Sequence, residues 1–141
     1  MPSPILKPVI ALVLWTFVMA VWLYATRIPA IKKHNVVYDP RRPPEEFHAQ
    51  IPAETRWKAD NYNHLLEQPT LFYAVALTLV FLDAGSGLNA GLAWAYVALR
   101  IAHSLVQALI NKVMVRFALF AVASLVLLVM TIRAAWIVFL A

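Results

Sequence analysis

Polar side chains recur at helical spacing along two stretches of this 141-residue sequence. The first stretch places polar residues four, three and four positions apart, and consists of Arg56, Asp60, Asn63 and Glu67, with His64 at its edge. The second has intervals of three, four and four, and consists of Arg100, His103, Gln107 and Asn111. Because an α-helix turns about 100° per residue, each set predicts one polar stripe on one helix face. A carboxylate opposite guanidinium and imidazole groups could bind a charged small molecule or move protons.

The residues around these stripes are mostly apolar, and they indicate the class of protein. Hydrophobic residues make up 62% of the chain and charged residues 13%, and the mean hydropathy is +0.71. A soluble domain of this size buries only about two-thirds of the surface that it exposes when unfolded, so it could not hide this much apolar surface. The composition excludes a soluble enzyme, a disordered tail and an ordinary nucleic-acid-binding module, and it indicates an all-α integral membrane protein.

Residue counts exclude several kinds of site. The absence of cysteine excludes disulfides, thiolate nucleophiles, iron–sulfur clusters and cysteine-ligated zinc. Three glycines are too few for a phosphate-binding loop or a dinucleotide fingerprint. His64 and His103 could ligate a metal together with Glu67 and Asp60, but no metal-binding motif spaces them, so no metal is expected.

Four apolar stretches could cross the roughly 30 Å of membrane hydrocarbon, which takes about 20 helical residues. We predict transmembrane helices at about residues 5–27, 56–83, 88–111 and 115–140. They predict a single four-helix transmembrane domain that occupies residues 1–141. Five of the nine prolines lie within residues 29–55, so this polar stretch is expected to form a loop rather than a helix.

Lysine and arginine are concentrated in the first and third connections between these helices. The first and its flanks carry seven of them and the third carries two, namely Arg27, Lys32, Lys33, Arg41, Arg42, Arg56 and Lys58, and Lys112 and Arg116. The glycine-containing turn at residues 83–87 carries none. Positive residues beside spans favour the cytoplasmic side. We therefore expect the basic loops to lie in the cytoplasm and both termini to lie on the other side of the membrane, which in a bacterium is the inner membrane. We attribute the net charge of +5 to this orientation rather than to nucleic-acid binding.

Glu67 and the polar residues of the third helix lie at similar predicted depths. Counted from the turn, Glu67 and His103 are each about 18 residues away and Arg100 about 15, which at about 1.5 Å per residue places them within reach of one another. The Glu67 carboxylate should therefore meet Arg100, His103 or both in the cytoplasmic half of the membrane. Alternatively, the stripes only hold helices together, at about 0.6 kcal/mol for each polar pair. Arg133 lies alone near the outer end of the fourth helix, where we expect it to snorkel to the interface.

The stretch from Arg56 to Tyr73 resembles the signature of the MAPEG family, the membrane-associated proteins in eicosanoid and glutathione metabolism. That signature runs arginine, asparagine, glutamate, proline and phenylalanine on the second of four helices. The stretch from Tyr96 to Phe120 is similar to the third-helix region of bacterial members. The resemblance implies a homotrimer of four-helix bundles that binds glutathione between neighbouring protomers near the cytoplasmic face.

The resemblance also implies roles for individual residues. Glutathione would contact residues of both polar stripes, namely Arg56, Asp60, Asn63, His64, Glu67, His103, Gln107 and Asn111. Glu67 would hold its amino group, and arginines would hold its carboxylates. The family's transferases stabilise the thiolate with a third-helix tyrosine and a nearby arginine. Here His103 and Gln107 occupy the comparable positions, which leaves Arg100 or Arg116 for this role.

Three functions are compatible with these features. The first is a glutathione transferase or peroxidase that acts on lipophilic electrophiles entering from the bilayer. The second is a non-catalytic protein, which would be a membrane scaffold, a lipid-binding protein or a small subunit of a larger membrane complex. The third is a transporter or proton relay through Glu67, His103 and Arg100. The expected partners are the lipid bilayer, further copies of the chain and a lipophilic small molecule.

Overall fold

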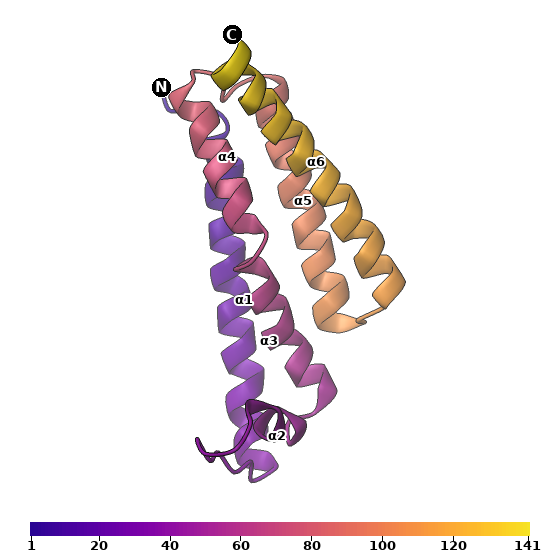
Figure 1. Cartoon of the computed structure of the whole chain (residues 1–141). Coiled ribbons are helices and arrows are strands. Elements are labelled where there is room, and N and C mark those ends of the chain that lie inside the picture. The colour runs from indigo at the N-terminus through magenta and orange to yellow at the C-terminus, as the bar shows by residue number, and fades with distance from the viewer.

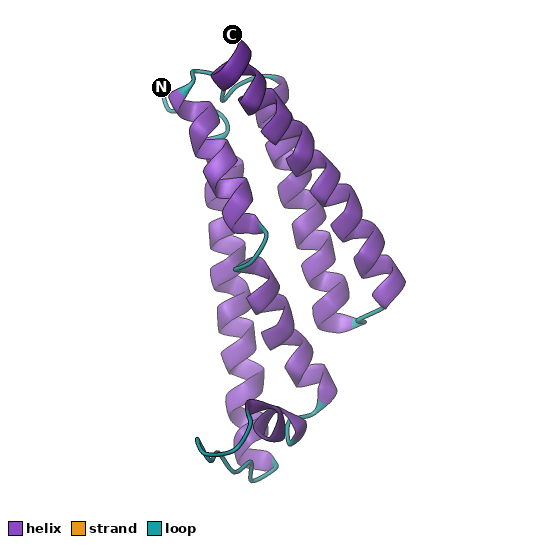
Figure 2. Cartoon of the chain, in the orientation of Figure 1, coloured by secondary structure: helices purple, strands orange, loops and turns teal.

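The computed structural model describes all residues from 1 to 141 and consists of helices joined by loops, without strands (Figure 2). The helices in chain order are α1 (Leu6–Lys33), α2 (Pro44–Ala49), α3 (Ala53–Leu65), α4 (Pro69–Phe81), α5 (Leu88–Leu109) and α6 (Val113–Leu140). α3 and α4 together form one span, so the chain has four helical spans that are long and apolar enough to cross a membrane. This confirms the predicted all-α, four-helix membrane architecture.

The spans pack as two unequal pairs (Figure 1). α3 and α4 run alongside α1, and α5 and α6 form a hairpin that contacts the first group through α1, α3 and α4. Both termini lie at the end of the bundle that carries the α4–α5 turn, and α2 lies at the opposite end (Figure 1). Toward the α2 end the hairpin diverges from α1, and α1 and α3 extend beyond it (Figure 1). α5 packs against α3, whereas α6 packs against α4 and α5, and a pocket lies between α3 and the start of α6.

The proline-rich stretch is more helical than its composition predicts. α1 does not end near residue 27 but continues through Pro29 to Lys33, and the expected loop at 29–55 contains α2 and the start of α3. Proline disrupts a helix interior, but its fixed φ suits the start of a helix. Accordingly Pro44 begins α2 and Pro52 directly precedes α3. Only residues 34–43 and 50–52 of this stretch are non-helical.

The second span is interrupted where the sequence predicts a continuous helix over 56–83. α3 ends at Leu65, residues 66–68 form a turn, and α4 begins at Pro69. Proline lacks an N–H group, and its ring collides with the carbonyl four residues earlier, which belongs to Leu65. As a result, Glu67 lies in a turn and not on a regular helical stripe.

The third connection has the predicted length of three residues but lies two positions earlier in the chain. α5 ends at Leu109 rather than at residue 111, and α6 begins at Val113 rather than at 115. Asn111 adopts a left-handed conformation, with φ of 54°. Asparagine tolerates this region better than most residues, so it allows the chain to reverse in a few residues.

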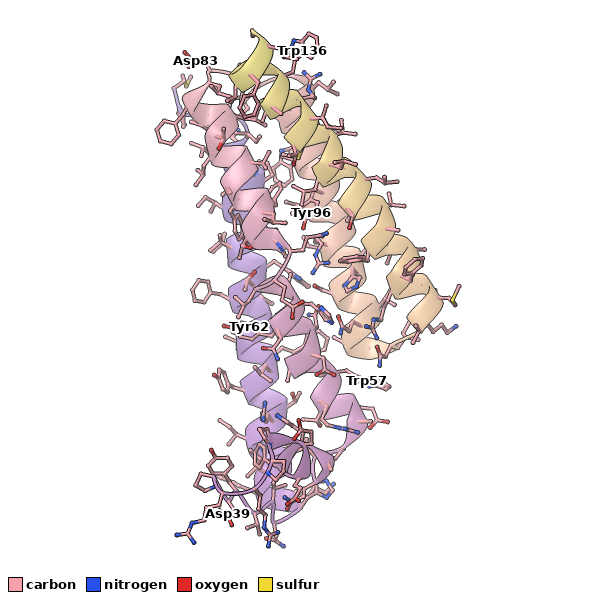
Figure 3. The ribbon with its side chains drawn as sticks, viewed as in Figure 1. Asp39, Trp57, Tyr62, Asp83, Tyr96 and Trp136 are labelled. Atoms are coloured by element: carbon pink, nitrogen blue, oxygen red, sulfur yellow. The ribbon has the colours of Figure 1, made fainter.

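The apolar core lies where all four spans meet, toward the end that carries the termini. Phe72 of α4 stacks on Tyr96 of α5, with ring centroids 4.6 Å apart. Leu12 and Met19 of α1 and Met130 of α6 are fully buried around this pair. Many other large apolar side chains point outward, as expected for helices that face lipid (Figure 3).

Candidate functional site

The polar stripe of α5 lies on the buried face of this helix. Arg100, His103 and Gln107 are each at most 4% exposed, so their predicted inward orientation is confirmed. The same face carries Ser104, which is fully buried. Asn111 does not extend the stripe, because it lies beyond the end of the helix and accepts a hydrogen bond from Nη1 of Arg116 on α6.

The polar stripe of α3 has the opposite orientation. Asp60, Asn63 and Glu67 are exposed on the single chain, while Arg56 and His64 are partly buried. The buried face of α3 is instead formed by Asn61 and Leu65, one to two positions away from the predicted stripe. Helical spacing identified which residues share a face, but it did not identify the face that packs against α5.

His64 connects the two stripes. Its imidazole ring lies edge-on to that of His103, with centroids 6.2 Å apart. Its backbone carbonyl accepts a long hydrogen bond of 3.4 Å from Nη2 of Arg100. Its Nδ1 lies 3.4 Å from a carboxylate oxygen of Glu67, which can pair with it when the imidazole is protonated. The predicted direct contact of Glu67 with Arg100 or His103 does not form, because Glu67 lies in the helix break at residues 66–68 and its side chain is exposed.

Most buried polar side-chain atoms without a hydrogen-bond partner lie on α3, on α5 and at the start of α6. They comprise Nε of Arg56, Arg100 and Arg116, Nδ1 of His103, both polar atoms of Asn61, Oγ of Ser104 and Oε1 of Gln107. A buried polar atom that stays unpaired costs about 1–3 kcal/mol, so these atoms call for a partner from outside the chain, such as water or a ligand. None of the three arginines forms an ion pair with a carboxylate of its own chain.

Six of the predicted site residues line two separate pockets, and the other four, Glu67, Arg100, Gln107 and Asn111, line neither of them. One, of about 300 Å³, lies between the end of α1, α2 and α3, and is lined by Arg56, Asp60 and Asn63 together with Arg27 and His48. The other, of about 250 Å³, lies in the opening between α3, α5 and the start of α6. Its lining residues are His64, His103, Val113, Arg116, Phe117 and Phe120. The first pocket is mostly polar and the second combines imidazole and guanidinium groups with aromatic rings.

A chain of side-chain hydrogen bonds, which the sequence did not predict, joins three of the helical spans. The hydroxyl of Tyr96 donates to Oε1 of Gln68 at 3.1 Å, and Nε2 of Gln68 donates to Oγ of Ser124 at 2.8 Å. This chain joins the turn before α4 to α5 and α6. The only signal in the sequence was a glutamine next to a helix-breaking proline and a serine within an apolar span.

Metal ligands are not gathered at the site. No group of three or more histidine, aspartate or glutamate side chains in the chain could hold a metal ion. The chemistry that the site offers is therefore that of cations, imidazoles and exposed carboxylates.

Comparison with known proteins identifies the family. The sequence model of the MAPEG family matches residues 5–136 of the 141, which includes three spans, most of the fourth and both polar stripes. Neither a curated protein nor a solved structure gives a significant match. Since the family match covers almost the whole chain, and the four-helix membrane architecture agrees with it, this protein belongs to the MAPEG family.

Proposed function

We propose that this MAPEG protein binds glutathione at the α2 end of its bundle and presents the thiol to lipophilic electrophiles. The observation that carries the proposal is the set of three arginines without carboxylate partners, Arg56, Arg100 and Arg116, each with a buried and unpaired Nε. An unpaired guanidinium held in a partly buried site is suited to a carboxylate ligand, which it can bind through two parallel hydrogen bonds.

The donor set fits the charges of glutathione. This tripeptide carries two carboxylates and one ammonium group at neutral pH. Arginines on α3, α5 and α6 are available for the carboxylates, and the exposed Glu67 and Asp60 are available for the ammonium group. Asn63, His64, His103, Gln107 and Asn111 complete the proposed contacts as hydrogen-bond donors and acceptors.

Bound glutathione would supply a thiol that, as thiolate, attacks an electrophilic centre. A nearby cation favours the thiolate over the thiol, and Arg100 and Arg116 are the residues proposed for this role. Nη2 of Arg100 donates a hydrogen bond to the backbone carbonyl of His64, and Nη1 of Arg116 donates one to Oδ1 of Asn111. The lipophilic substrate would enter from the bilayer beside Phe117 and Phe120, which line the pocket between α3 and α6.

The exposed stripe of α3 supports a homotrimer as the active form. Asp60, Asn63 and Glu67 are exposed on an isolated chain, where any of them at hydrocarbon depth would face lipid, which is unfavourable for polar and charged groups. A neighbouring copy placed over α3 would cover these groups and close the glutathione site. The concentration of lysine and arginine at the α2 end supports a cytoplasmic location for this end and, in a bacterium, the inner membrane.

A non-catalytic role is the second candidate, and one observation favours it. The hydroxyl of Tyr96 donates its hydrogen bond to Gln68, and no tyrosine follows Tyr96 in the sequence. The chain therefore has no free tyrosine on α5 to act on a thiol. In this case the protein would bind glutathione or lipid as a scaffold or as a small subunit of a larger membrane complex.

Titration calorimetry with glutathione on the purified full chain, followed by turnover of a chromogenic electrophile, tests both candidates. We expect saturable binding that is weakened in E67Q and retained in E54Q, a control at an exposed glutamate in the first turn of α3. Binding with turnover above the protein-free blank supports the transferase, and binding without turnover supports the scaffold. If glutathione does not bind to the wild type, the proposal is wrong.

A further inference from the structure

Asn89 occupies a buried position at the end of the bundle opposite the proposed glutathione site. It lies in the first turn of α5 and is 4% exposed. Its Nδ2 donates to the carbonyl of Ala84 in the α4–α5 turn at 2.7 Å. Its Oδ1 accepts a hydrogen bond of 2.6 Å from Nε of Arg133 on α6. Both ends of the amide are therefore engaged, and together they hold the guanidinium of Arg133 in one place.

Arg133 itself is exposed, and it is not the isolated side chain that the sequence predicts. Only its Nε is hydrogen-bonded within the chain, so the N–H groups of both terminal nitrogens remain free. No carboxylate lies within ion-pair distance of it. A planar guanidinium whose Nε is anchored presents its remaining donors in the fork that suits a phosphate or carboxylate.

The surface next to this guanidinium is apolar and hollowed. Ile132, Trp136 and Ile137 line a shallow pocket of about 300 Å³ together with Arg133. Ile132 and Trp136 are both more than half exposed. Trp136 lies at the end of the bundle that carries the termini, the same end as Asp83 (Figure 3). One cation beside an apolar groove matches a molecule with a charged head and a hydrocarbon tail.

The depth of Arg133 restricts which anion can reach it. α6 has 28 residues, so it is about 42 Å long and exceeds the roughly 30 Å of hydrocarbon. Leu140, the last residue of the helix, is seven positions after Arg133, which is about 10 Å along the axis. The guanidinium therefore lies close to the boundary between hydrocarbon and headgroups, where the phosphate of a lipid is the anion at hand.

We propose that Arg133, positioned by Asn89, binds the phosphate of an anionic glycerophospholipid in the leaflet at the end of the bundle that carries the termini. One acyl chain of this lipid lies along Ile132, Trp136 and Ile137. The site involves none of the residues proposed for glutathione, so it stands or fails independently of the proposed function.

Native mass spectrometry of the full-length, delipidated protein tests the site. The protein in mild detergent is mixed with equal amounts of phosphatidylglycerol and phosphatidylcholine of the same acyl chains. We expect a preferential phosphatidylglycerol adduct in the wild type. Loss of charge-assisted hydrogen bonds predicts an affinity about tenfold lower for R133Q. N89A, which leaves the charge but removes its anchor, should weaken binding by a smaller factor.

The controls separate this site from unspecific attraction and from a site for free phosphate. Lys7 is an exposed cation at the first turn of α1, at the same end of the bundle, so K7Q should bind phosphatidylglycerol like the wild type. Excess inorganic phosphate should not displace the lipid. The proposal is wrong if R133Q binds phosphatidylglycerol like the wild type, or if K7Q loses binding to the same extent as R133Q. It is also wrong if inorganic phosphate displaces the lipid. Finally, it is wrong if the wild type takes up no phosphatidylglycerol, as would happen if a second copy of the chain covered Trp136.

Discussion

The polar faces of α5 and α3 contain similar residue types but have opposite surroundings. Arg100, His103 and Gln107 of α5 are buried within one chain, whereas Asp60 of α3 and Glu67 in the turn after α3 are exposed. Positive charge is thus retained inside the bundle, and the carboxylates that could neutralise it lie outside. In proteins whose charged groups serve only packing, buried charges are usually paired within the chain. The separation indicates that the polar site is incomplete in a single, unliganded chain.

This arrangement has a cost in stability that a ligand can offset. Arg100 is 1% exposed, it makes one long hydrogen bond to a carbonyl, and its Nε is unpaired. A buried charge without a counter-ion destabilises a fold, and replacing such groups by apolar residues of similar volume often stabilises it. The comparison therefore predicts that substitutions in the polar stripe of α5 change stability and ligand binding in opposite directions, and that substitutions in the exposed polar stripe of α3 change only binding.

The largest expected effect is that of R100M. Methionine fills much of the same volume without a charge, so we expect the melting temperature Tm to stay the same or rise while glutathione affinity falls by about 100-fold, the loss of a bidentate charge-assisted contact. Calorimetric titration and thermal unfolding in detergent measure the two quantities. R41M, at an exposed arginine of the loop, is the matched control and should change neither. A lower Tm with unchanged affinity would show that Arg100 has only a structural role.

E67Q is expected to have the second-largest effect. The Glu67 side chain is exposed, and its one contact in the chain is the 3.4 Å approach to His64, so unfolding free energy should change by less than about 0.5 kcal/mol. Glutathione affinity should fall by about tenfold, the value of one charge-assisted hydrogen bond. E54Q controls for the loss of an acidic residue from α3. Equal losses in both variants would remove the basis for assigning the ammonium group to Glu67.

Q68A separates the structural polar contacts from those of the binding site. It removes the bonds from Tyr96 and to Ser124, and at about 0.6 kcal/mol for each interhelical contact we expect the unfolding free energy to fall by about 1 kcal/mol. Unfolding in mixed detergent micelles measures this loss. T78A removes a hydroxyl that bonds only within its own helix and should have almost no effect. If Q68A lowers glutathione affinity as strongly as E67Q does, the chain of hydrogen bonds belongs to the binding site.

The smallest expected effect is that of N61L. Asn61 is a fully buried residue of α3, and neither polar atom of its side-chain amide has a hydrogen-bond partner. Leucine has a similar shape without the unsatisfied amide, so the unfolding free energy should stay unchanged or rise by up to about 1 kcal/mol. The same unfolding assay applies, and N63L, at an exposed position of the same helix, is the control. A clear destabilisation by N61L alone would show that bound water or a ligand pairs with this amide.

Several features of the site depend on contacts between distant segments, and these could not be predicted from residue spacing. The break at residues 66–68 could have been expected from Pro69, but its consequence for Glu67 could not, because the direction of the turn depends on how α4 packs against α1 and α6. The hydrogen bonds from Tyr96 to Gln68 and from Arg133 to Asn89 join residues 28 and 44 positions apart. The roles proposed for the individual glutathione-binding residues stay predictions.

The sequence alone determined the membrane class and the four spans, because the thickness of the hydrocarbon requires long apolar segments. It also determined the inward polar face of α5, because residues on one helix face recur with the helical period, and it carried the resemblance to the family. The tertiary structure decided which face of α3 is buried, where the bundle opens and which residues pair. In water the hydrophobic effect orients a helix, so its apolar stripe reveals its buried face. In a membrane, lipid and protein interior are equally apolar, and only packing and hydrogen bonding select the face that meets a neighbour.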